Sequence, residues 1–116
     1  MILDKFIIKK FHKTKYNCYH LALDIFNEYN VNIATINESS DDVESVFSHY
    51  LESWKKIEEL KVPCLLVIAN NNFNISNHVG VYIGDNKFIH CLENQNVIIS
   101  KMKLWKNKIK GFYDVK

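Results

Sequence analysis

Residues 77–91 have the sequence Asn77-His78-Val79-Gly80-Val81-Tyr82-Ile83-Gly84-Asp85-Asn86-Lys87-Phe88-Ile89-His90-Cys91. Up to Ile83, aliphatic residues alternate with His78, Gly80 and Tyr82, which is the period-2 pattern of a half-buried strand. Residues 84–86 tolerate the positive φ of a hairpin connection. A second alternating run follows, so the stretch predicts two antiparallel strands with one histidine in each.

The register of this hairpin decides whether the two histidines can cooperate. With a three-residue loop over 84–86, His90 lies opposite Gly80 and His78 is its diagonal neighbour on the same face, at roughly 7–8 Å between backbones. A two-residue Asp85-Asn86 loop would slip the register by one and place the imidazoles on opposite faces. We expect the paired arrangement, with Gly80 leaving open space over that face for a substrate or a third group.

Composition narrows the classes of function. A chain of 116 residues with 47% apolar residues predicts one globular domain over residues 1–116. All 15 basic residues are Lys, and the absence of Arg, the usual reader of phosphate and guanine, argues against nucleic acid as a partner. Three cysteines without a C-x-x-C pair disfavour a disulfide framework and a zinc ribbon. We expect no signal peptide, no membrane span and no cofactor.

A helix is predicted from residue 17 to residue 30, with Asn17 as its N-cap. Its apolar residues fall on one face, at Cys18, Leu21, Ala22, Ile25, Phe26 and Tyr29. Cys18 would lie in the first turn, where the helix dipole lowers the pKa of a thiol. The alternative is that Cys18 is a small buried hydrophobic residue, as unpaired cysteines commonly are.

The remaining chain predicts an α+β fold with helices segregated from an antiparallel sheet. Residues 1–15 have the composition of a short amphipathic helix, and the apolar stripe from Val43 to Leu60 predicts a second long helix. The apolar run over 64–69 indicates a strand buried on both faces. Further strands are expected at 97–99 and 111–115, with a short basic helix over 101–110 that turns Met102, Leu104, Trp105 and Ile109 inward.

A cysteine at a helix N-terminus beside a histidine on a sheet suits a thiol nucleophile and its base. A third polar group must orient the base and fix its tautomer. Cys18, His78 and His90 supply these residue types, in the roles of nucleophile, base and orienting group.

The motifs Tyr16-Asn17-Cys18-Tyr19-His20-Leu21, His78-Val79-Gly80-Val81-Tyr82-Ile83-Gly84 and Phe88-Ile89-His90-Cys91 resemble the NlpC-type cysteine peptidases. These are compact papain-like enzymes of bacterial cell-wall turnover. In that family the Cys heads a helix, the base His opens the strand, and a third polar residue follows twelve residues later. The resemblance covers roughly residues 14–115, and it implies a papain-like fold with N-terminal helices packed against a small antiparallel sheet.

The chain departs from the family pattern in three places. Tyr19-His20 replaces the usual Ser-Gly after the Cys, and Pro63-Cys64-Leu65 replaces Pro-Gly-Asp before the first strand. Phe6 occupies the position of a family tyrosine that helps bind the oxyanion. The Cys18 backbone N–H should be one oxyanion donor, while Tyr16, Tyr19 and Asn17 are candidates for the second donor or for substrate contacts.

The resemblance implies a thiol hydrolase that cleaves an amide bond in peptidoglycan stem peptides, after a D-glutamyl residue. Gly111-Phe112-Tyr113 and the aromatic residue after the Cys look most like the branch encoded with phage tail proteins. We therefore expect synthesis in the cytoplasm and delivery to the cell wall in a virion or other particle, with phage tail proteins as partners.

Three alternatives remain open at this point. The same fold can serve as a non-catalytic tail-assembly protein with a degenerate site. The machinery can instead perform acyl transfer or amide hydrolysis on another substrate. A zinc site from Cys18, His78, His90 and Cys91 ranks lowest, because period 2 points Cys91 away from His90.

Overall fold

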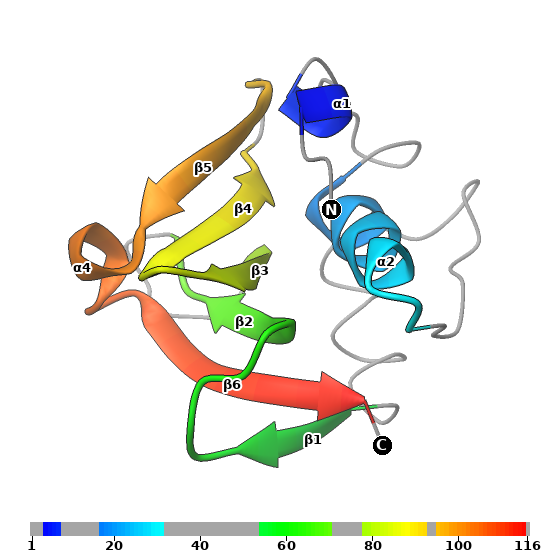
Figure 1. Ribbon diagram of the computed structural model, residues 1–116. Coiled ribbons are helices and arrows are strands. Elements are labelled where there is room, and N and C mark those ends of the chain that lie inside the picture. The colour runs from blue at the N-terminus through cyan, green and yellow to red at the C-terminus, as the bar shows by residue number, and fades with distance from the viewer. Residues whose placement is uncertain (1–3, 8–16, 32–53, 71–77, 93–94, 116) are drawn as a thin grey trace.

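The computed structural model describes residues 4–7, 17–31, 54–70, 78–92 and 95–115 (Figure 1). In chain order the elements are α1 (Asp4–Ile7), α2 (Cys18–Glu28), β1 (Trp54–Ile57), β2 (Cys64–Ile68), β3 (His78–Gly84), β4 (Lys87–Cys91), β5 (Val97–Lys101), α4 (Met102–Trp105) and β6 (Ile109–Val115). The six strands form one sheet in the order β1-β6-β2-β3-β4-β5. Every neighbouring pair is antiparallel, which agrees with the α+β class expected from the sequence.

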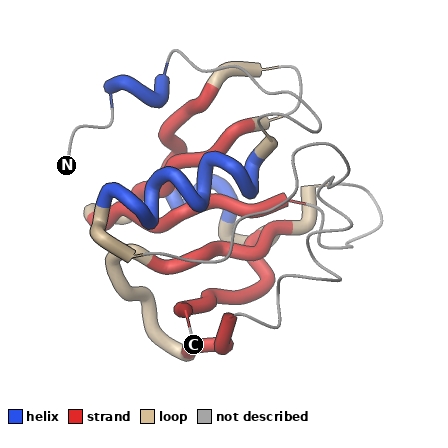
Figure 2. Tube along the Cα trace, turned by 90° about the vertical axis from the view of Figure 1, so that its right-hand side faces the viewer, coloured by secondary structure: helices blue, strands red, loops and turns tan. Residues whose placement is uncertain are grey.

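The two faces of the sheet carry separate apolar clusters. On one face lies α2 (Figures 1 and 2). Its Leu21, Ile25 and Phe26 belong to a cluster with residues of β2, β3 and β4. On the other face, Met102 and Trp105 of α4 pack with a second cluster formed by Cys64, Leu66, Ile68 and Phe88. Successive residues of a strand point to opposite faces, so β2 is buried along its whole length because it serves both clusters. The doubly buried strand is confirmed.

The β3–β4 hairpin reaches the expected pairing by a different route. Its turn is Asp85-Asn86, both at φ 58°, which is the two-residue geometry that matches strand twist. The register shifts between Tyr82 and Gly84, so β3 carries one extra residue there. This bulge compensates for the shorter loop, and His90 still lies opposite Gly80. The predicted three-residue loop was therefore wrong, but the predicted register, with His90 opposite Gly80, is confirmed.

The helix predicted from Val43 to Leu60 is wrong over its described part, since residues before Trp54 lie outside the described ranges. Trp54–Ile57 is a strand paired with β6, and residues 58–60 are not helical. The spacing of Trp54, Ile57 and Leu60 fits a helix, but pairing with the exposed edge of β6 satisfies the backbone groups of β1. Tertiary pairing here outweighs local pattern.

Of the two short helices expected outside α2, the first lies mostly outside the described residues and the second is shorter than expected. Of residues 1–15, the structure describes only α1, in which Phe6 is buried. The basic helix over 101–110 is reduced to the single turn α4, and Ile109 belongs to β6. Leu104 is 75% exposed, so its expected inward orientation is wrong. None of the described helices is long and apolar enough to cross a membrane.

Candidate active site

Cys18 opens α2, as the sequence predicted, and Asn17 caps that helix. The Asn17 side-chain oxygen accepts hydrogen bonds from the backbone N–H groups of Tyr19 at 3.0 Å and His20 at 3.2 Å. The Asn17 N–H in turn donates to His20 Nδ1 at 3.1 Å, which completes a capping box. This reciprocal cap holds Cys18 at a defined position at the end of the helix.

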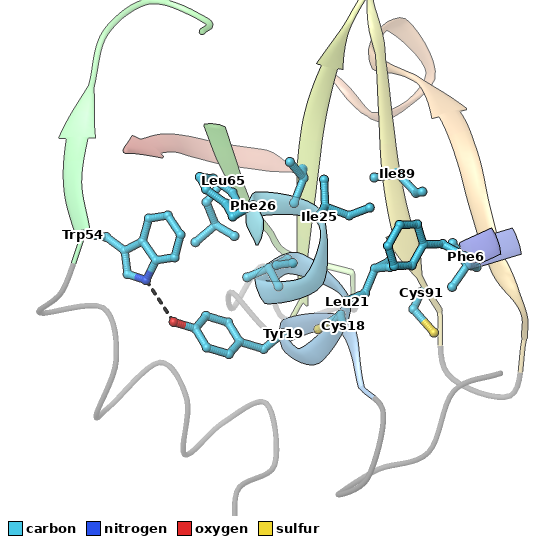
Figure 3. Close-up of a cluster of buried hydrophobic side chains, with 14 residues drawn as sticks. Phe6, Cys18, Tyr19, Leu21, Ile25, Phe26, Trp54, Leu65, Ile89 and Cys91 are labelled. Atoms are coloured by element: carbon cyan, nitrogen blue, oxygen red, sulfur yellow. Dashed lines mark hydrogen bonds between the residues drawn. The ribbon is translucent and has the colours of Figure 1, made fainter. Parts of the chain in front are cut away.

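The Cys18 thiol is buried against the sheet, with only 1% of the residue exposed. It belongs to the apolar cluster on the α2 face, together with Phe6 and Cys91 (Figure 3). Val79 of β3 is a member of the same cluster. Loss of hydration on burial raises the pKa of the thiol to about 12, and it outweighs the backbone N–H groups of Val79, Cys18 and Tyr19, which donate toward the sulfur and lower that pKa. The expected lowering of the thiol pKa by the helix N-terminus is therefore wrong, because burial dominates.

The two histidines form a directly hydrogen-bonded pair. His78 Nε2 lies 2.9 Å from His90 Nδ1, and both side chains are on the same face of β3 and β4. This confirms the predicted pairing of the two rings. Gly80 does not leave the predicted open space, however, because a Cβ added there would lie 2.8 Å from Phe88 Cδ2. The glycine instead permits close packing of Phe88 and His90.

A third group, which the sequence reasoning missed, continues the chain of hydrogen bonds. His90 Nε2 lies 2.8 Å from Ser100 Oγ on β5. The sequence could have revealed Ser100 through the strand predicted after β4. Ser100 of β5 lies opposite Phe88, and Phe88 precedes His90 by two residues, so all three side chains share one face. Extending the pairing by one strand would have found it.

Aromatic residues enclose the histidine pair and keep it uncharged. The Trp105 ring meets His90 edge-on at 4.9 Å between centroids, and Phe88 lies 4.4 Å from His90. Burial lowers the pKa of His78 to about 3, with a further contribution from His90, and lowers the pKa of His90 to about 4. Both imidazoles are therefore neutral at pH 7.

The thiol and the histidine pair lie on opposite faces of the sheet. Cys18 packs with Val79 and Cys91 on the α2 face, while His78 and His90 contact Trp105 on the α4 face. The sulfur meets β3 near its start, where it is hydrogen-bonded to the backbone of Val79, the residue that follows His78. Within the described ranges no hydrogen bond joins the thiol to an imidazole, so the catalytic roles of Cys18, His78 and His90 stay predictions.

Of the three candidates for the second oxyanion donor, Asn17 and Tyr19 lie within the described residues. Asn17 is fully buried and its oxygen caps α2. Tyr19 is 2% exposed, and its hydroxyl accepts a hydrogen bond from Trp54 Nε1 at 3.0 Å (Figure 3). Tyr16 lies outside the described residues. Phe6 packs in the same cluster as Cys18, without a hydroxyl to offer.

Cys91 lies on the α2 face, away from His90, as the alternation predicted. No group of three or more His, Cys, Asp or Glu side chains gathers to hold a metal ion in the part of the chain that the structure describes. The four side chains of the possible zinc site are divided between the two faces of the sheet.

Together these features define an α+β domain with a cysteine at the start of a helix and a buried histidine pair on the adjoining antiparallel sheet. A family model described as the NlpC/P60 family matches residues 9–113. Because this match spans nearly the whole sequence, the chain belongs to the NlpC/P60 family, which confirms the resemblance noted in the sequence. No curated protein matches the chain significantly.

Proposed function

We propose that this protein is a cysteine peptidase or amidase that cleaves an amide bond in peptidoglycan stem peptides, after a D-glutamyl residue. The observation that carries the proposal is the hydrogen-bonded pair of His78 on β3 and His90 on β4, with the backbone of β3 also contacting the capped Cys18. Family membership supports a cell-wall substrate of this class. The D-glutamyl preference rests on the resemblance alone.

In the proposed reaction, Cys18 Sγ attacks the scissile carbonyl carbon while His78 takes the thiol proton. The backbone N–H of Cys18 stabilises the oxyanion, and His78 returns the proton to the leaving amine. Water, deprotonated by His78, then hydrolyses the thioester and frees the thiol. His90 holds His78 in position and stabilises its protonated form.

This mechanism starts from a neutral thiol and a neutral imidazole. With a thiol pKa of about 12 and an imidazole pKa of about 3, a preformed thiolate–imidazolium pair is strongly disfavoured. Proton transfer should therefore accompany attack. Because the thiol and His78 lie on opposite faces of the sheet, the proposed reaction requires their side chains to rearrange in the substrate complex until they come within hydrogen-bond distance. Catalytic hydrogen bonds often tighten only in that complex.

The test is digestion of defined muropeptides, followed by mass spectrometry of the products. Cys18→Ala should abolish cleavage and His78→Ala should nearly do so, whereas His90→Ala should retain measurable activity because it removes only the orienting group. Cys91→Ala is the matched control, because it deletes a buried thiol from the same cluster and should leave cleavage intact. Cleavage that survives Cys18→Ala in a folded protein would rule out the proposed nucleophile.

A second candidate is a non-catalytic protein with a degenerate site. The separation of Cys18 and the histidines on opposite faces, together with the buried thiol, favours this candidate. The same digestion separates the two, since a degenerate site predicts no product with any muropeptide from the unaltered protein.

We further propose that a virion or other particle, such as a phage tail, carries the domain to the cell wall after cytoplasmic synthesis. Support comes from the sequence, in Gly111-Phe112-Tyr113 and the aromatic Tyr19 after Cys18. Mass spectrometry of purified tail particles should detect the chain in stoichiometric amount, and its absence from them would exclude this route.

A further inference from the structure

Ser100 ends a three-membered chain of side chains that crosses three adjacent strands. The chain runs from His78 on β3 through His90 on β4 to Ser100 on β5, with contacts of 2.9 and 2.8 Å. His90, the central member, is fully buried, so both of its ring nitrogens are committed to these two contacts. The protonation of one ring nitrogen therefore depends on what the other nitrogen meets.

Two proton arrangements fit these distances when both imidazoles are neutral. In the outward arrangement, His78 Nε2–H donates to His90 Nδ1, and His90 Nε2–H donates to Ser100 Oγ. In the inward arrangement, the Ser100 hydroxyl donates to His90 Nε2, and His90 Nδ1–H donates to His78 Nε2. A hydroxyl can play either part, as donor or as acceptor.

The two arrangements leave His78 in different states. In the outward arrangement its Nε2 carries the proton and Nδ1 holds a free lone pair. In the inward arrangement Nε2 is the acceptor, so the neutral ring carries its proton on Nδ1. Only in the outward arrangement can His78 Nδ1, the ring nitrogen that does not contact His90, accept a proton.

We propose that Ser100 is a positioning residue that accepts the His90 Nε2–H and thereby selects the outward arrangement. The inference rests on the proposed function, in which His78 takes the thiol proton; this role falls to Nδ1, because Nε2 contacts His90. Ser100 is only partly buried, so its own hydroxyl hydrogen can turn to solvent while the oxygen accepts. The hydroxyl acts at a distance, through the tautomers of two rings.

Position 100 allows a matched pair of variants, because the Thr and Val side chains have nearly the same shape and only Thr carries a hydroxyl. Both are β-branched and suit a strand position. Ser100→Thr should keep the acceptor and Ser100→Val should remove it. Ser100→Ala provides a third variant in case the larger side chains disturb β5, and circular dichroism checks that each protein folds.

The first measurement is nitrogen NMR of the histidine rings, which distinguishes protonated from unprotonated ring nitrogens without any substrate. Signals are assigned by their loss in His78→Gln and His90→Gln variants. In the unaltered protein and in Ser100→Thr, we expect both rings protonated at Nε2. In Ser100→Val, His90 should shift toward the Nδ1–H tautomer or a mixture, because its Nε2–H has lost its acceptor.

The second measurement is kcat/KM on one muropeptide. We expect a loss of about tenfold in Ser100→Val, mostly in kcat, and near-complete retention in Ser100→Thr, since a tautomer effect acts on the proton-transfer step and not on binding. A His90 protonated at Nδ1 in the unaltered protein, or identical tautomers in the Thr and Val variants, would overturn the assignment of Ser100. Failure of the unaltered protein to cleave muropeptides would count against the proposed function, while the NMR result judges the proton arrangement separately.

Discussion

The Cys18 thiol should be alkylated much more slowly in the folded protein than an ordinary thiol is at pH 7. A thiol with the ordinary pKa of 9.0 is about 1% ionised at pH 7, whereas a pKa of about 12 leaves about one thiolate in 10⁵. Because alkylation proceeds through the thiolate, the folded protein should react about a thousandfold more slowly than an unperturbed thiol. Restricted access to a residue that is 1% exposed slows the reaction further.

The assay is alkylation by iodoacetamide at pH 7, with the labelled positions identified by peptide mass spectrometry. The urea-unfolded protein gives the reference rate for each cysteine. Cys64 and Cys91 are also fully buried and serve as internal comparisons in the folded protein. We expect all three to label slowly when folded and rapidly when unfolded.

The pH dependence provides the sharper test. The labelling rate of Cys18 should keep rising with pH above 9, without an inflection near neutrality. Fast labelling of Cys18 alone at pH 7, with an apparent pKa below 8, would refute the conclusion that burial dominates the thiol. It would instead indicate the thiolate that the helix N-terminus was first expected to favour.

Three further predictions concern stability. Gly80→Ala should lower the free energy of unfolding in urea by about 1–3 kcal/mol, because the new methyl would lie 2.8 Å from Phe88 and 3.3 Å from His90 Cβ. Gly111→Ala should cost less, because its closest contact is a Tyr113 side-chain atom at 3.1 Å, and equal effects of the two variants would contradict the packing argument. Asn17→Ala should cost about 1–2 kcal/mol through loss of the cap on α2, whereas Asn17→Asp retains an acceptor oxygen and should cost less. Acid should destabilise the protein below pH 6.5. The pKa values of His78 and His90 fall from 6.5 to about 3 and about 4 on folding, so the unfolded state binds more protons than the folded state as pH falls through this window. The double variant His78→Gln with His90→Gln should flatten the plot of the urea unfolding midpoint against pH between pH 6.5 and 4, and an unchanged plot would show that other groups control acid unfolding.

Local pattern sufficed for the start of α2 and for the pairing of the two histidines. Asn17 and the apolar spacing after it predicted the start of α2, because capping and amphipathicity are properties of a few consecutive residues. The alternation around Gly80 predicted the pairing of His78 with His90, although the turn that produces it differs from the one expected. The family was also accessible from the motifs around Cys18, His78 and His90.

The tertiary structure decided what depends on residues far apart in the chain. Trp54–Ile57 became a strand because β6, more than fifty residues later, offered an unpaired edge. Ser100 entered the histidine chain because β5 lies beside β4. The pKa of Cys18 rose because the sulfur is buried in an apolar cluster assembled from the helices and the strands of the sheet, which removes it from water. Burial and strand pairing are long-range properties, so the chemistry of the thiol follows from the assembled sheet and not from the helix that carries it.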